Sequence, residues 1–313
     1  MDNQKPFFRI IDEICEEKNI EQEKVSYGWI RMLYKDGVTH GIVRNQLSIN
    51  SAVSFIIAED KYATYEVLDF NNIPVILHKM IFSPITRSKY HETKYLYMAI
   101  NFWEQNNRKI VIKANNSCEG KDVYVCYTEK EIKDTIEKLF KENNDSVSIC
   151  PYLDIDYEYR AIYLCGEIIY VYKKKKAFVI GDGTSNLSDL IKTITEERYV
   201  EMSKDLDLNY IPKLNEEVDI SWKHNLCNGA IPIIIDDTDT YINEVKDVAV
   251  RAGTAIGIEF ASVDIAVTKD NKVLVMEINK NVCMNKFTEL VPNGYEIAKG
   301  VYSKVIDKMF NMS

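Results

Sequence analysis

The segment from Ser262 to Asn279 constrains the fold more than any other part of this sequence. Its two apolar runs, SVDIAVT and KVLVMEIN, are separated only by the polar residues KDN. Short apolar runs rich in β-branched residues are typical of buried strands, and a turn this short joins strands that pair antiparallel. We therefore expect an antiparallel pair, with Val267 about opposite Val273, inside a fold that contains a buried antiparallel sheet.

Three polar residues interrupt these apolar strands. Glu277 and Asn279 are two residues apart and therefore share one face of their strand. The antiparallel pairing brings Asp264 near them, so that three oxygen ligands converge. Carboxylate and amide oxygens are the ligands that Mg²⁺ prefers, which predicts a magnesium site. The alternative is a set of acids at strand ends that face solvent.

The composition limits the classes of partner. Of the 313 residues, 46% are hydrophobic, and the formal net charge is −9. An acidic chain is a poor match for nucleic acid or an anionic membrane, so we expect neither as a partner, while a local basic site for a small anion stays compatible. The seven cysteines are scattered without a C-x-x-C motif, and no apolar run approaches the ~20 residues of a membrane span. We expect a cytoplasmic protein with reduced thiols; a homo-oligomer is left open.

The expected architecture is an α+β fold of two lobes with a short N-terminal segment. We place the boundaries at residues 1–58, 59–150 and 151–313. The second lobe is expected to be dominated by hairpins, because EYRAIYLCGEIIYVY alternates on both sides of Cys165-Gly166.

Helices are predicted at three places. One spans Asp60 to about Phe70, before two asparagines and a proline. A second begins at Thr128, which with Glu131 matches a capping box. The third, in TYINEVKDVAVRAGTAIG, has the apolar spacing of an amphipathic helix that ends at Gly257.

Three further groups of polar residues are candidates for a site. Lys113 ends the strand IVIK before the small-residue loop ANNSCEG, which suits a polyphosphate, although a lysine at a strand end is often only solvated. Glu158 and Arg160 share a strand face, and the alternative there is an exposed ion pair. The loop KHN contains His224, which we interpret as structural or solvated. The lysine run 173–176 puts Lys174 on one face with the last lysine, or is simply a solvated basic run.

Taken in order, these pieces resemble the ATP-grasp ligase superfamily over roughly residues 50–290. The matching segments are IAEDKYATYEVLDFNNIPV, KIVIKANNSCEGKDV, DYEYRAIYL, KKKKAFVIGDGTSNLSDLI, KHNLCNGA and SVDIAV…VMEIN. The motifs are most similar to the ATP-grasp modules of cyanophycin synthetase and of bifunctional bacterial glutathione synthetase. No single segment is specific, but six in the same order are.

The resemblance implies ATP and Mg²⁺ as cofactors, with Mn²⁺ as an alternative ion. It implies that Arg160 and Lys174 contact the transferred phosphoryl group, although any lysine from 173 to 176 fits the second role. Nucleotide contacts are implied for Lys61, Lys113, Ser117, Gly120, Tyr152, Leu153, Asn225 and, at the ribose, Glu158. Metal ligands are implied at Asp264, Glu277 and Asn279.

The implied activity is ligation of a small-molecule carboxylate and an amine, amino acids or peptides, through an acyl phosphate, with release of ADP and phosphate. The alternatives are a small-molecule kinase on the same scaffold and a non-catalytic nucleotide-binding protein. The chain also departs from the family pattern. The loop NNSCEGKD has one glycine, Cys150-Pro151 stands where an acid often precedes the hinge, and EINKNVCMN lacks the usual proline or glycine.

Overall fold

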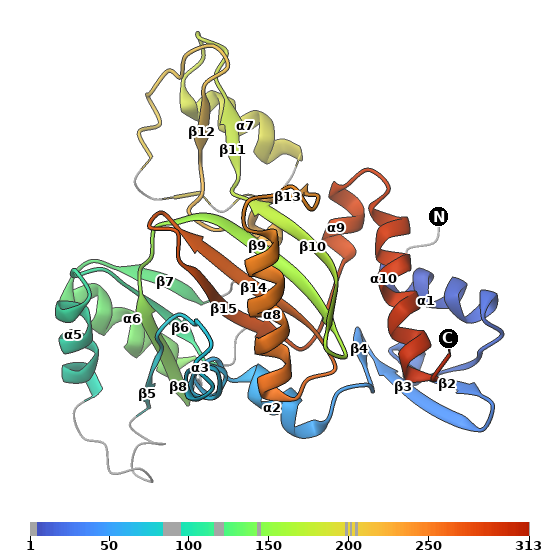
Figure 1. Ribbon diagram of the computed structural model, residues 1–313. Coiled ribbons are helices and arrows are strands. Elements are labelled where there is room, and N and C mark those ends of the chain that lie inside the picture. The colour runs from blue at the N-terminus through green and yellow to red at the C-terminus, as the bar shows by residue number, and fades with distance from the viewer. Residues whose placement is uncertain are drawn as a thin grey trace.

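A five-stranded antiparallel sheet forms the centre of the protein (Figure 1). The computed structural model describes residues 5–83, 95–115, 122–142, 145–197, 200, 202–203 and 206–312. The strand order is β13-β10-β9-β14-β15. Their bounds are Ile155–Leu164 for β9, Glu167–Lys175 for β10, Ile231–Ile234 for β13, Phe260–Thr268 for β14 and Val273–Asn279 for β15.

The local predictions for this sheet are confirmed. Strands β9 and β10 form a hairpin in which Cys165 and Gly166 both have positive φ, 48° and 91°, as expected for the residues of a tight hairpin turn. Strands β14 and β15 pair antiparallel with Val267 opposite Val273. The two strong sequence signals, a short turn and alternating apolar residues, therefore fix the register locally.

Helix α8 covers one face of the central sheet (Figure 1). It spans Ile242–Ile256, and its apolar side chains pack on alternate residues of β9 and β14. The helix ends where Gly257 adopts φ 65°, a conformation that glycine reaches without strain. Because α8 occupies this face, the other face of β9, β10, β14 and β15 is left for polar side chains.

A second, four-stranded sheet of order β5-β8-β6-β7 forms a separate lobe. Its strands are Lys79–Phe82, Ser146–Pro151, Ile110–Ala114 and Val123–Cys126, in that order. Helices α5 (Tyr95–Gln105) and α6 (Glu129–Lys141) pack on one face of it. The predicted capping box of Thr128 and Glu131 opens α6.

Helices α2 (Ala52–Glu59) and α3 (Lys61–Phe70) lie between the two sheets in the chain. The predicted helix α3 is confirmed, with Asp60 accepting a hydrogen bond from Ala63 N at its start. After α3, Val75 forms a parallel bridge to Val275 of β15. This bridge ties the segment that leads into the second sheet to the edge of the central one.

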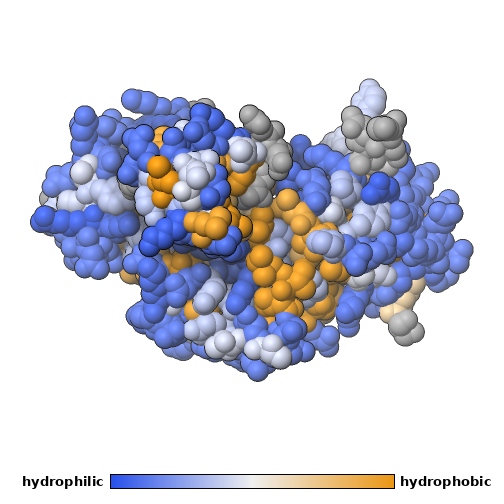
Figure 2. All heavy atoms as spheres, turned by 90° about the horizontal axis from the view of Figure 1, so that it is seen from above, coloured by the Kyte–Doolittle hydropathy of each residue, from blue (hydrophilic) through white to orange (hydrophobic). Residues whose placement is uncertain are grey.

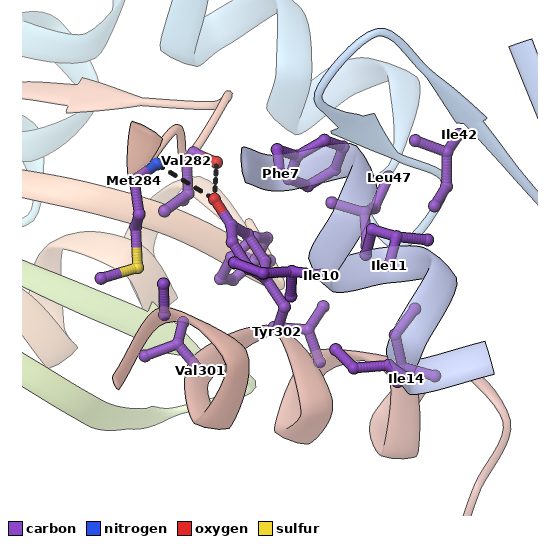
Figure 3. Packing of buried hydrophobic residues seen from close by; sticks show 14 of the residues in the cluster. Phe7, Ile10, Ile11, Ile14, Ile42, Leu47, Val282, Met284, Val301 and Tyr302 are labelled. Carbon is purple, nitrogen blue, oxygen red and sulfur yellow. Dashed lines mark hydrogen bonds between the residues drawn. The ribbon is translucent and has the colours of Figure 1, made fainter. Parts of the chain in front are cut away.

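The N-terminal residues share a hydrophobic core with the C-terminal helices. Helix α1 (Pro6–Glu17) and the sheet β1-β2-β3-β4 pack against α9 (Asn285–Leu290) and α10 (Gly294–Met309). The four strands are Glu21–Val25, Ile30–Lys35, Val38–Val43 and Gln46–Leu47, with the short 3-10 turn η1 (Ser26–Gly28) between the first two. Figure 3 shows side chains of α1 facing Tyr302 of α10, whose hydroxyl accepts from Met284 N and donates to the Val282 carbonyl.

A small lobe projects from the edge of the central sheet, at the top of Figure 1. It contains β11 (Phe178–Ile180), α7 (Leu187–Glu197) and β12 (Glu217–Asp219) around its own apolar core. The 3-10 turn η2 (Leu226–Asn228) then leads into β13. The view from above, onto this lobe, shows hydrophobic patches among polar surface (Figure 2), and exposed apolar residues of the lobe include Ile180, Ile211 and Leu214.

Two features of the described part of the chain bear on its class. Its six cysteines are all free thiols. Among the helices of that same part, we find none with the length and apolar character needed to cross a membrane.

Candidate active site

The face of the central sheet opposite α8 carries a cluster of charged side chains. Five of its members are ionisable: Glu158, Arg160, Lys174, Asp264 and Glu277, which we call the charged cluster together with the amide of Asn279. The strand register brings them together. Asp264 lies opposite Arg160 on one side and opposite Glu277 on the other. Two residues along, Lys174 lies opposite Glu158. Residues two apart share a face, so all five point the same way.

Direct contacts hold the charged cluster together. The guanidinium of Arg160 donates to both carboxylate oxygens of Asp264, at 2.8 and 2.7 Å. The ammonium of Lys174 pairs with Glu158 and lies 3.1 Å from Asp264 Oδ2. The side chains of Lys174 and Asp264 are only 4% and 3% exposed. A buried charged network of this kind is costly unless each charge is compensated, which makes a binding role a stronger explanation than stability.

Burial and mutual charge set the protonation of the charged cluster. Burial alone raises the pKa of Asp264, but Arg160 and Lys174 outweigh it and hold that pKa well below its usual value. Burial lowers the pKa of Lys174, but Asp264 and Glu158 reverse the shift, so its pKa is raised. At neutral pH Asp264 is therefore a carboxylate and Lys174 an ammonium ion. The pKa of Glu158 is raised, chiefly by burial.

The three predicted metal ligands lie together. The Nδ2 of Asn279 donates to Glu277 Oε1 at 3.1 Å and to Asp264 Oδ2 at 3.2 Å. The donor set consists of two carboxylates and an amide, all able to offer oxygen, with one carboxylate almost fully buried. Such a set fits Mg²⁺ or Mn²⁺, which prefer hard oxygen ligands. The residues therefore fit the ion that the sequence predicts.

Only one lysine of the run 173–176 joins the charged cluster. Lys173 points to the opposite face and pairs with Asp239 at 2.5 Å. Lys175 pairs with Glu217 at 2.5 Å, and Lys176 lies 3.5 Å from Asp219. The structure thus resolves the choice that the sequence left open, and Lys174 is the lysine placed among the site residues.

His224 is a neighbour of the charged cluster that the sequence interpretation missed. Its Nδ1 lies 3.5 Å from Glu158 Oε2, and the residue is 6% exposed. Burial, followed by the charges of Lys176 and Lys174, lowers the pKa of His224 to about 3. The contact therefore joins a neutral imidazole to a carboxyl group. The next residue, Asn225, accepts from Cys227 N at 2.8 Å and caps η2, so its printed contact is with its own turn.

The second sheet contributes two lysines. Lys61, at the start of α3, donates to the carbonyls of Ala114 and Asn115 at 3.4 and 3.0 Å. Lys113 lies in β6. Burial, then Lys113 and Lys61, lowers the pKa of His78, which shows that both ammonium groups lie near the same imidazole. Ser117 and Gly120, predicted phosphate contacts, lie outside the described residues.

An apolar cluster joins the two sheets beside these lysines. Val111 and Cys150 of the second sheet share it with Leu274 and Met276 of β15. Tyr152 and Leu153, the predicted nucleotide contacts, pack partly buried against it. The ammonium of Lys109 lies 3.5 Å from the centre of the Tyr152 ring. A flat apolar base with a polar edge would find both apolar and cationic neighbours here.

Comparisons with known proteins give the same fold. No family model matches the chain. The bifunctional glutathione biosynthesis protein of Clostridium perfringens is 24% identical over 293 residues, which cover 84% of this chain and 35% of that protein. The chain thus spans about a third of the curated relative's length.

Solved structures resemble most of the chain. The bifunctional glutathione synthetase of Pasteurella multocida matches with a TM-score of 0.58 and 18% identity, covering 97% of this chain and 45% of the other. The D-alanine–D-alanine ligase of Bacillus anthracis matches with a TM-score of 0.55 and 18% identity, covering 84% and 69%. Both are similar in the arrangement of two sheets that the sequence motifs predicted. The chain therefore has the ATP-grasp fold.

Proposed function

We propose that the protein is an ATP-dependent carboxylate–amine ligase that forms an amide or peptide bond through an acyl phosphate and releases ADP and phosphate. The observation that carries this proposal is the buried charged cluster. It combines an acidic, all-oxygen metal site with two cations, Arg160 and Lys174, on the same face of one sheet. This combination suits the transfer of a phosphoryl group from a metal-bound nucleotide.

The reaction proposed has two steps. A carboxylate oxygen of the acid substrate attacks the γ-phosphorus of ATP, giving an acyl phosphate and ADP. The amine then attacks the acyl carbon, its proton is lost, and inorganic phosphate leaves. Both steps need positioning and charge compensation rather than a nucleophilic side chain.

The residues of the chain divide the work between the two sheets. Lys61 and Lys113 are proposed to hold the phosphates, with Tyr152 and Leu153 beside the base. Arg160 and Lys174 carry positive charge where the transferred group acquires negative charge. Mg²⁺, held by Asp264, Glu277 and Asn279, would neutralise the phosphate oxygens of the bound nucleotide.

Three parts of this assignment are more specific than the fold itself. Glu158 was predicted to bind the ribose, but its contacts place it with Lys174 and His224, so a role in holding Lys174 is an equally direct use of its charge. The lobes 59–150 and 151–313 are proposed to clasp the nucleotide, and residues 1–58 to be a short N-terminal segment packed on the second lobe. Amino acids or peptides are the proposed substrates, in a cytoplasmic protein without a nucleic-acid or membrane partner.

The experiment that tests the activity starts with a screen for ADP release over amino acids and dipeptides, singly and in pairs. A pair that stimulates release where single compounds do not identifies both substrates. The acid is then supplied with ¹⁸O in its carboxylate. We expect one labelled oxygen in the released phosphate, formed in step with ADP, and no AMP.

Two other outcomes of that experiment would contradict a ligase. A stable phosphorylated product without free phosphate would identify a kinase, the alternative on the same scaffold. AMP and pyrophosphate would show that the acid attacks the α-phosphorus instead. Absence of nucleotide turnover with all pairs, together with tight ATP binding, would favour a non-catalytic nucleotide-binding protein.

The placement of the phosphates makes a separate prediction. Lys113→Ala and Lys61→Ala should each weaken ATP binding by roughly 1–3 kcal/mol, because each removes a charge-assisted phosphate contact. Calorimetry with ATP measures the effect. Lys130→Ala, on the exposed side of α6, is the matched control and should leave the affinity unchanged. Equal affinities for all three variants would place the phosphates elsewhere.

A further inference from the structure

The amide of Asn279 is turned away from the orientation that metal binding requires. Both of its contacts, to Glu277 Oε1 and Asp264 Oδ2, are made by the Nδ2 group. An amide nitrogen that donates two hydrogen bonds lies between the carboxylates, where a cation bound by both would lie. The amide nitrogen has no free lone pair for an ion, so Asn279 can ligate only through Oδ1. Binding therefore requires the amide to turn over.

Ser262 lies where the displaced Nδ2 would point. It is the residue of β14 directly opposite Asn279 in the strand pairing, and it shares its face with Asp264. The residue is 1% exposed, and its Oγ is buried without a hydrogen-bond partner in the described part of the chain. A buried hydroxyl without a partner costs about 1–3 kcal/mol, so the position asks for an explanation.

We propose that Ser262 is a positioning residue that accepts a hydrogen bond from Nδ2 of Asn279 once the amide has turned and Oδ1 faces the metal ion. Directly opposite residues of an antiparallel pair have Cβ atoms about 4.5–5.5 Å apart, a distance that a serine and an asparagine side chain can bridge. The hydroxyl then gains its missing partner only in the metal-bound state. This inference rests on the metal site of the proposed function.

The test measures metal binding rather than catalysis. Calorimetry gives the dissociation constant of ADP with and without Mn²⁺, and the ratio of the two reports how strongly the ion tightens ADP binding. In Ser262→Ala we expect this ratio to fall about 10-fold, as for loss of a group that orients a metal ligand. Binding of ADP without Mn²⁺ and the thermal stability of the ligand-free protein should not fall, because the change removes only an unpartnered hydroxyl.

Asn279→Asp provides the matched background. A carboxylate offers oxygen to the ion in either orientation and has no Nδ2 to hold, so Ser262→Ala should not change the ratio there. An equal fall in both backgrounds would mean that Ser262 acts through the fold, and the proposal would be wrong. An unchanged ratio in the wild-type background would also overturn it, provided that Glu277→Gln abolishes the Mn²⁺ effect. If Mn²⁺ fails to tighten ADP binding to the wild-type protein, the metal site itself fails, and this inference fails with it.

Discussion

Glu277→Gln is expected to fold normally and to lose turnover by about 10²-fold or more. The substitution keeps the size of the side chain and an oxygen that can accept from Asn279 Nδ2. It removes one of the two negative charges offered to the metal ion, on which the proposed phosphoryl transfer depends. The rate of ADP release at saturating Mg²⁺, with the substrate pair from the screen, measures the effect.

The control for this variant is Glu167→Gln, at the exposed start of β10. It makes the same chemical change far from the charged cluster and should leave both turnover and stability unaltered. Near-normal ADP release by Glu277→Gln would exclude the assignment of this carboxylate to the metal.

Lys174→Met should lower both stability and turnover. The methionine keeps much of the apolar stem, but it leaves Glu158 and Asp264 without a cation in a buried site. Breaking a buried pair in this way costs about 3–5 kcal/mol of the free energy of unfolding. Turnover should fall more than ATP affinity, because the charge that Lys174 meets develops as the phosphoryl group transfers. Thermal unfolding and steady-state kinetics measure the two effects.

A second variant separates the structural from the catalytic part of this effect. Adding Glu158→Gln to Lys174→Met removes both partners and should restore much of the stability, but not the turnover. Lys175→Ala, which loses only an exposed pair with Glu217, should change stability by about 0–1 kcal/mol and leave turnover intact. Full recovery of turnover in the double variant would show that Lys174 only balances Glu158.

The sequence predicted those features that depend on neighbours along the chain. The capping box at Thr128, the end of α8 at Gly257 and the pairing of Val267 with Val273 each follow from residues within one turn or one hairpin. From that register the convergence of Asp264 with Glu277 followed as well. Local signals were therefore sufficient for the metal trio, whose members all belong to a single hairpin.

The rest of the candidate site depends on contacts between distant segments. His224 reaches Glu158 only because η2 and the loop before it return to the sheet next to β10. The pairing of Arg160 with Asp264 spans 104 residues and needs β9 and β14 to be neighbours. No periodicity or turn signal contains that information, so the sequence identified these residues without showing which of them touch.

The core shared by α1 and α10 has a consequence for how the protein is made. Phe7, Ile10 and Ile11 are buried against residues between Val282 and Phe310, so they stay without partners until that part of the chain has been synthesised. At about 5–20 residues per second, the ribosome needs roughly 10–50 s to proceed from Leu47 to Val282. During this interval the earliest apolar surface of the nascent chain is exposed, and it is there that we expect a chaperone to be needed.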